Sequence, residues 1–121
     1  MKKSDKNTEN DLIAALTLVC EDAQATVNGF LWITHRINYK NVPQSLYILC
    51  VFDTNRKLLE ARQLHKDDYL HTSIKKHLDA IGISLKSNHK NIYMDTEENC
   101  DNEHEGDWNK RISHNYNISL N

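Results

Sequence analysis

Metal-ligating side chains are the first chemical groups to consider in this sequence. The chain of 121 residues has seven histidines and three cysteines. Cys100 and His104 are four residues apart, a spacing that places both on one face of a helix. Thiolate and imidazole are ligands that Zn²⁺ prefers. A second partial set combines carboxylates with a histidine at similar spacing: Asp67, Asp68 and His71. Each set alone has too few ligands for a metal site, and neither has the spacing of a known metal-binding motif. A metal site built from these residues is therefore a hypothesis.

Acidic residues are concentrated in one segment near the end of the chain. Residues 95–107 contain seven acids and no Lys or Arg, although the net charge of the whole chain is only −2. Such asymmetry predicts a basic protein surface as the partner of this segment. The candidate partner-binding residues are Glu97, Glu98, Asp101, Glu103 and Glu105.

Basic residues form a second, smaller group between positions 75 and 90. The candidate contacts with a nucleic-acid phosphate are Lys75, Lys76, Lys86, His89 and Lys90. The sequence pI of about 6.4 lies below the basic range expected of a dedicated nucleic-acid-binding domain. Nucleic-acid binding is therefore an alternative hypothesis, and a solvated helix end is the simpler interpretation.

Glycine and cysteine usage argues against several classes of enzyme. The three glycines, Gly29, Gly82 and Gly106, are isolated, whereas phosphate-binding loops and the G-x-S-x-G nucleophile elbow need clustered glycines. No cofactor is expected. Cys20 and Cys50 lie in apolar patterns and Cys100 lies among carboxylates, so all three are expected to be structural thiols.

The first half of the chain predicts one long helix and two strands. Apolar residues recur at helical spacing from Leu12 to Val27, and Gly29 ends this pattern. Residues 30–39 alternate between apolar and polar side chains and predict a half-buried strand. Residues 46–52 are apolar at odd-numbered and even-numbered positions alike, so both faces of this second strand should be covered and the strand should be central. The second face needs its own cover, either a third helix or a second copy of the chain across a twofold axis.

The second half predicts a helix, a hairpin and a short acidic helix. A short helical piece over residues 56–64 precedes an amphipathic helix with Leu70, Ile74, Leu78 and Ile81 on its buried face. Residues 83–85 and 92–94 are interpreted as a short hairpin with a polar tip at 87–90. Thr96 is the expected N-cap of a helix over residues 97–105.

These elements predict an α+β fold with the order α-β-β-α-β-β-α. We expect a four-stranded antiparallel sheet with the two amphipathic helices on one face. Residues 1–8 are expected to form a disordered arm, residues 9–112 a single domain and residues 113–121 a loose tail. The sequence has no apolar run of the ~18 residues typical of a membrane span, and its polar start predicts a cytoplasmic protein.

Four segments of the sequence resemble a family of uncharacterised small bacterial proteins. They are Leu16-Thr17-x-Val19-Cys20-Glu21, Phe30-x-Trp32-x-Thr34-His35-x-x-Asn38-Tyr39, Cys50-Val51-Phe52-Asp53-Thr54 and Ala80-Ile81-Gly82-Ile83. The resemblance covers roughly residues 10–112. Some members carry a label that links them to the DNA-binding regulator Fis, whose helix-turn-helix lies at its C-terminal end. This sequence departs from that pattern because its expected C-terminal helix is acidic, and the family implies no catalytic residues.

The function hypothesis that follows is a non-catalytic cytoplasmic interaction module that binds a protein partner. A small metal-dependent enzyme and a weak nucleic-acid-binding regulator are the alternatives, and each depends on one of the residue sets above.

Overall fold

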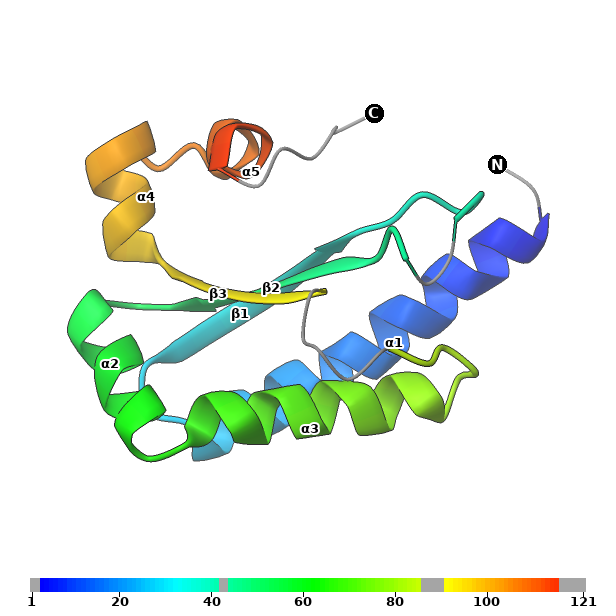
Figure 1. Ribbon diagram of the computed structural model, residues 1–121, viewed down its shortest axis with the longest axis horizontal. Helices are drawn as coiled ribbons and strands as arrows, with labels where there is room; N and C mark the ends of the chain where they lie inside the picture. Colours follow the sequence, from blue (N-terminus) through cyan, green and yellow to red (C-terminus); the bar gives the residue numbers. More distant parts are fainter. Residues whose placement is uncertain (1–2, 42–43, 86–90, 116–121) are drawn as a thin grey trace.

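A computed structural model describes residues 3–41, 44–85 and 91–115. Eight elements follow one another along these residues (Figure 1). They are α1 (Lys3–Thr26), β1 (Phe30–Arg36), β2 (Tyr47–Phe52), α2 (Asn55–Gln63), α3 (Lys66–Asp79), β3 (Ile92–Thr96), α4 (Glu97–His104) and α5 (Trp108–Asn115). The fold is therefore α+β, as the sequence predicts.

β2 is the central strand of a three-stranded sheet in the order β1-β2-β3. All six of its residues are buried. The prediction that an uninterrupted apolar strand lies in the centre of the sheet is confirmed, since only a central strand is covered on both faces and both edges. β1 pairs with it antiparallel, and the register shifts between Phe30 and Trp32, which makes a bulge at Leu31.

The expected four-stranded antiparallel sheet and the expected order of helices are wrong. β3 pairs with β2 in parallel, because the chain crosses from one end of β2 to the other through α2 and α3 before it re-enters the sheet. Ile83 and Leu85 are buried but lie outside any strand, so the apolar alternation at 83–85 reflects coil that packs on the core. The predicted hairpin tip at 87–90 lies outside the described residues. The single acidic helix of the prediction is followed by a separate helix, α5.

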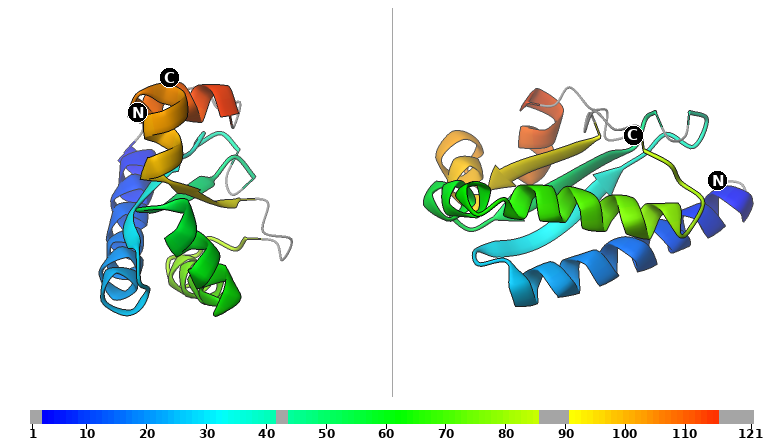
Figure 2. Two further views of the ribbon diagram at one scale, coloured as in Figure 1. Left: turned by 90° about the vertical axis from the view of Figure 1, so that its left-hand side faces the viewer. Right: turned by 60° about the horizontal axis from the view of Figure 1, so that its bottom comes forward.

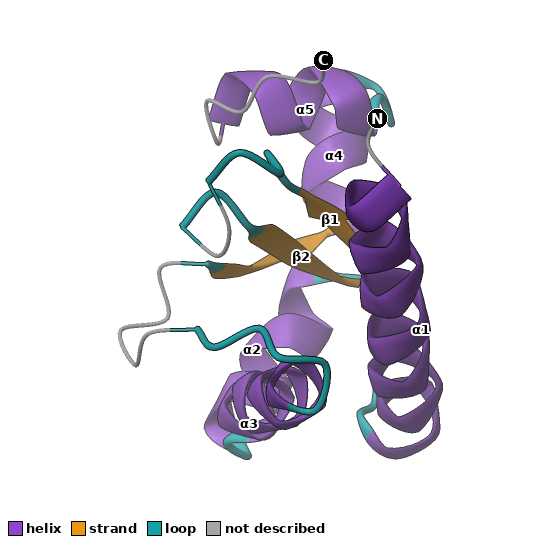
Figure 3. Cartoon of the chain, turned by 90° about the vertical axis from the view of Figure 1, so that its right-hand side faces the viewer, coloured by secondary structure: helices purple, strands orange, loops and turns teal. Residues whose placement is uncertain are grey.

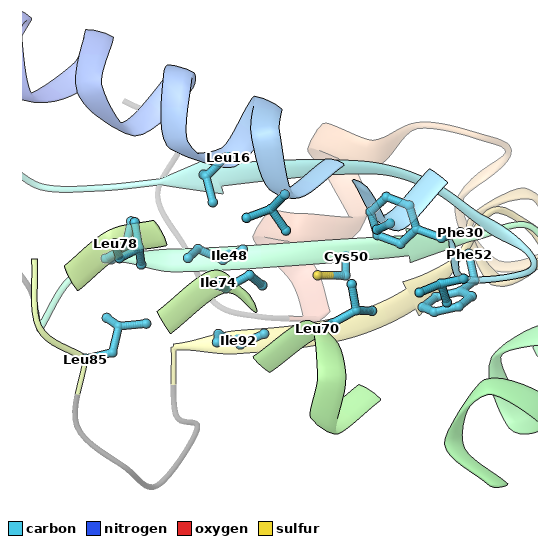
Figure 4. Close-up of a cluster of buried hydrophobic side chains, with 14 of the residues drawn as sticks. Leu16, Phe30, Ile48, Cys50, Phe52, Leu70, Ile74, Leu78, Leu85 and Ile92 are labelled. Carbon is cyan, nitrogen blue, oxygen red and sulfur yellow. The ribbon is translucent and has the colours of Figure 1, made fainter. Parts of the chain in front are cut away.

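Two layers of helices cover the sheet from opposite sides. α1 and α3 lie beside each other against one face, while α5 lies on the other side of the sheet (Figures 1 and 3). The larger core fills the space between the sheet and α1 and α3; Figure 4 shows Leu16, Ile48, Leu70, Ile74 and Leu78 within it. Full burial of each such side chain contributes about 1.5–3 kcal/mol to the free energy of unfolding, relative to an exposed side chain.

The second face of β2 has a smaller core under α5. Tyr47, Leu49 and Val51 point to this side and pack with Ile112, while Trp32 and Trp108 border them. The cover for this face is therefore α5, and not the acidic helix over residues 97–105 that was one of the two expected covers.

Helices extend beyond both expected limits of the domain. α1 begins at Lys3, so residues 3–8, expected as part of a disordered arm, are helical. α5 continues to Asn115, into the segment expected as a tail, and residues 116–121 lie outside the described part. Figure 2 shows α1 beside α3, with the N-terminal end of α1 reaching past α3.

Gly29 makes the turn from α1 into β1. Its φ is +87°, and a Cβ at this position would lie 2.6 Å from the Cβ of Lys57 on α2. Only glycine avoids both the left-handed strain and this contact. The turn lets the Gly29 carbonyl accept a hydrogen bond from the Asp53 N–H at 2.8 Å, which ties the start of β1 to the end of β2.

Candidate functional site

A buried ion pair anchors the acidic segment, residues 95–107, to the sheet. The Arg111 side chain donates from Nε to Asp95 Oδ2 at 2.6 Å and from Nη2 to Asp95 Oδ1 at 3.0 Å. Both side chains are at most 5% exposed. Arg111 Nη1 also donates to Glu103 Oε2 at 2.8 Å. One guanidinium therefore joins β3, α4 and α5.

The Arg111 guanidinium is charged, as arginine is in proteins, and its hydrogen bonds favour that charged state. Burial lowers the pKa of the guanidinium, but its hydrogen bonds to Asp95 and Glu103 outweigh burial and raise that pKa above its ordinary value. Arg111 is thus a permanent cation, and the carboxylates around it have a structural task.

Glu97 forms a second inward contact of the acidic segment. Its Oε1 accepts hydrogen bonds from the indole N–H of Trp32 at 2.8 Å and from that of Trp108 at 2.9 Å. The two indoles also contact each other edge to face, with ring centroids 5.0 Å apart. Glu97 therefore connects β1 with α5 across the end of the sheet.

The start of α4 is joined to the start of α2. Because β2 and β3 are parallel neighbours, their carboxyl ends meet at one edge, where both helices begin. Thr96 caps α4 by accepting from the Asn99 N–H at 3.0 Å. Glu98 Oε1 accepts from the Asn55 N–H at 2.8 Å, and Asn55 Nδ2 donates to Asn99 Oδ1 at 2.8 Å. These contacts fix the position of α4.

Three exposed carboxylates lie along the outer face of α4. Glu98 and Asp101 have the i, i+3 spacing of one helix face, Glu105 follows as the C-cap residue of α4, and all three are exposed. We call them the α4 acidic stripe. Glu103 is exposed as well but is bound to Arg111. Of the five candidate partner-binding residues, Glu97 and Glu103 thus point inward to partners within the chain, whereas Glu98, Asp101 and Glu105 are exposed, although one oxygen of Glu98 accepts from the Asn55 N–H.

The candidate metal ligands do not come together. Cys100 is fully buried, and His104 Nδ1 lies 3.3 Å from Arg111 Nη1. Asp67, Asp68 and His71 lie on α3. Within residues 3–41, 44–85 and 91–115, no group of three or more His, Cys, Asp or Glu residues could hold a metal ion.

The candidate nucleic-acid contacts are only partly described. Lys75 and Lys76 are exposed on the last turns of α3, where cations suit the helix dipole. Lys86, His89 and Lys90 lie outside the described residues.

A pocket between α1 and β1 was not foreseen from the sequence. It has a volume of about 240 Å³ and is open to solvent. Its lining residues come from the middle of α1 and the second half of β1: Ile13, Leu16, Thr17, Cys20, Glu21, Ile33, Thr34 and His35. The i, i+3, i+4 and i+7 spacing from Ile13 to Cys20 is the only signal in the sequence, and the same spacing is typical of a buried helix face.

His35 is held in place by the N-terminal part of α1. Its Nε2 lies 3.1 Å from Glu9 Oε1, and Tyr39 donates a hydrogen bond to the other oxygen of Glu9. His35 therefore forms a fixed end wall of the pocket.

The cysteines differ in access to solvent. Burial raises the pKa of the Cys20 thiol, a hydrogen bond from the Ile33 backbone opposes this, and the Glu21 carboxylate adds to it. Burial raises the pKa of Cys50 to about 12, and burial also raises that of Cys100, partly offset by Arg111. Cys50 and Cys100 are fully buried, whereas Cys20 is half-buried.

We expect iodoacetamide to alkylate Cys20 before Cys50 and Cys100 in the folded protein. The thiolate is the reactive form, and the raised pKa keeps Cys20 protonated at neutral pH. The reaction should therefore be slow at pH 7. Its rate should rise with pH, and the pH at the midpoint of this rise should be above that of a cysteine in a short peptide. Mass spectrometry after timed labelling at several pH values gives both results. Earlier labelling of Cys100, or a midpoint below that of the peptide, would contradict this description of the pocket.

No family model, curated protein or solved structure matches the chain. The resemblance to small bacterial proteins therefore stays a prediction from the quoted segments. Among the described residues, no helix has both the length and the apolar character that crossing a bilayer requires.

Proposed function

We propose that this chain is a protein-interaction module that binds a basic protein surface through the α4 acidic stripe, Glu98, Asp101 and Glu105. The observation that carries the proposal is the division of the acidic segment into two sets. Asp95, Glu97 and Glu103 hold α4 and α5 in place through Arg111 and the two indoles. The stripe faces solvent on a helix fixed at its N-terminal end by Thr96.

Glu105 supports the proposal because it is unfavourable for α4 itself. It is the C-cap residue and has a φ of +53°, in the left-handed region that favours glycine or asparagine. A negative charge at the C-terminal end of a helix also opposes the helix dipole, at a cost of about 0.3–1 kcal/mol. Glu103 shares this disadvantage, but the charge of Arg111 compensates it. A carboxylate that destabilises its own helix is consistent with a role in recognition.

Charge complementarity also limits the class of partner. The acidic segment has no Lys or Arg, so an approaching basic surface meets no repulsion within it. Surface carboxylates of this kind increase association rates and specificity more than they increase the affinity of a complex. The partner surface should therefore be rich in Lys or Arg, and binding should weaken with salt.

The proposal is tested by affinity purification with two variants of equal net charge. The stripe variant carries Glu98→Gln, Asp101→Asn and Glu105→Asn. The control variant neutralises three exposed acids on other elements, Asp11→Asn, Glu60→Gln and Asp79→Asn. Each lysate is kept at low salt and divided into one half treated with nuclease and one half left untreated, and captured proteins are quantified by mass spectrometry.

We expect a basic protein that the wild type and the control variant capture in stoichiometric amount and that the stripe variant loses. The stripe variant should unfold within a few degrees of the wild type, since Gln at position 98 keeps an oxygen that can accept from the Asn55 N–H, and Asn suits the left-handed position of Glu105. The same proteins captured by all three baits would reject the assignment of the stripe. Loss of capture on nuclease treatment would instead favour the nucleic-acid hypothesis.

A further inference from the structure

The pocket between α1 and β1 combines an apolar floor with hydrogen-bond acceptors. Ile13, Leu16 and Ile33 contribute apolar surface. Thr17 Oγ1 donates its hydrogen to the Ile13 carbonyl at 2.6 Å, so its lone pairs are left to accept. Glu21 is exposed at the same pocket and adds a carboxylate. A ligand with an apolar body and a donor-rich head would match both parts.

The charges around the pocket favour a cationic head. Glu21 is the one carboxylate among the lining residues, which include no Lys or Arg. Arg36 follows His35 on β1, and its Nη1 donates to Thr34 Oγ1 at 3.1 Å and to the His35 carbonyl at 2.8 Å. The Arg36 guanidinium is therefore held by these two acceptors, and the carboxylate of Glu21 has no ion-pair partner among the lining residues.

A peptide strand is a poor match for this site although β1 is an edge strand. Gln24 Nε2 donates to the Leu31 carbonyl at 2.6 Å, Cys20 accepts from the Ile33 backbone, and Arg36 donates to the His35 carbonyl. Side chains of the same molecule therefore occupy backbone groups that an added strand would need. The bulge at Leu31 further interrupts the regular edge.

The volume of the pocket limits the size of its ligand. About 240 Å³ corresponds to roughly eight water molecules. This is below the usual range for drug-sized ligands, so a molecule of about six to nine non-hydrogen atoms is appropriate.

From these observations we propose that the pocket binds a small aliphatic amine. The alkyl chain lies against Ile13, Leu16 and Ile33, and the ammonium donates to the Glu21 carboxylate and to Thr17 Oγ1. An ammonium has three donors and no acceptor, which suits a head site made of acceptors. This site involves α1 and β1 alone and is independent of the α4 acidic stripe.

The test is a titration of the wild-type protein with n-hexylammonium, in which a ¹H-¹⁵N correlation spectrum is recorded at each ligand concentration. Hexanoate and hexanol serve as probes of equal chain length with a negative and a neutral head. We expect saturable shifts for hexylammonium, confined to amides near residues 13–21 and 33–35, and at least tenfold weaker binding of the other two probes. Bound hexylammonium should also slow the alkylation of Cys20, which lines the pocket.

Three variants separate this proposal from unspecific binding. Glu21→Gln keeps the shape of the pocket but removes its charge and should weaken hexylammonium binding at least tenfold. Ile13→Trp fills the pocket and should abolish binding, whereas Leu18→Trp, an equally exposed position on α1 outside the pocket, should leave it unchanged. Shifts that do not saturate, equal binding of hexanoate, or full affinity of Glu21→Gln would overturn the proposal.

Discussion

Replacement of Asp95 by alanine is expected to lower the free energy of unfolding by about 3–5 kcal/mol. The substitution leaves Arg111 buried without its bidentate partner, and the guanidinium stays charged because arginine is not deprotonated in proteins. Glu103 cannot compensate fully, since its side chain is 56% exposed and contacts a different nitrogen. The loss can be measured by urea denaturation followed by circular dichroism.

An exposed ion pair provides the control for this experiment. Arg56 and Glu60 are paired on α2 at 3.2 Å, with side chains 87% and 47% exposed. Glu60→Ala should therefore cost less than about 1 kcal/mol. If Asp95→Ala cost no more than Glu60→Ala, the Arg111 pair would not be the anchor that joins β3, α4 and α5.

Replacement of Ile112 by alanine is expected to destabilise the fold by about 2–5 kcal/mol. Ile112 is 1% exposed and is the buried residue by which α5 packs on Leu49 and Val51. Its loss leaves a cavity above the central strand, beside Trp32 and Trp108. Tryptophan fluorescence during urea unfolding reports on this region directly.

Leu18→Ala is the matched control, because Leu18 is 56% exposed on α1. It should change the free energy of unfolding by less than about 0.5 kcal/mol. Equal stability of Ile112→Ala and the wild type would mean that α5 does not cover the second face of the sheet in solution.

The sequence predicts elements well where one residue pattern has one structural solution. The uninterrupted apolar run at 46–52 has to be central, and β2 is the middle strand. Helical spacing of apolar residues predicts that α1 and α3 pack with one face each, and both do so on the larger core. Thr96 is the N-cap of α4, as its residue type and position predict.

Strand pairing could not be predicted in the same way. The pattern at 92–94 indicates a strand but carries no information about its partner or its direction. β3 is parallel to β2 because α2 and α3 form a crossover, and Ile83 and Leu85 are buried in coil instead of a fourth strand. Apolar alternation over three residues is too short to distinguish these two arrangements.

The division of the acidic segment depends on contacts between distant residues. Composition counts seven acids in residues 95–107 but does not show which of them face inward. Asp95 is buried because Arg111 follows sixteen residues later, and Glu97 faces inward because two indoles converge on it. Once these partners are known, Glu98 and Asp101 on α4 and Glu105 at its C-cap are identified as exposed acids.

Recognition through the α4 acidic stripe is tested most directly by calorimetry with the captured basic protein. The dissociation constant of its complex is measured with the wild type, the stripe variant and the control variant of equal net charge. The account predicts that the stripe variant binds about 100-fold more weakly, a loss of about 2.7 kcal/mol. The control variant should stay within about threefold of the wild type, which corresponds to less than about 0.7 kcal/mol. Equal affinity for the wild type and the stripe variant, or an equal loss in the control variant, would contradict recognition through α4.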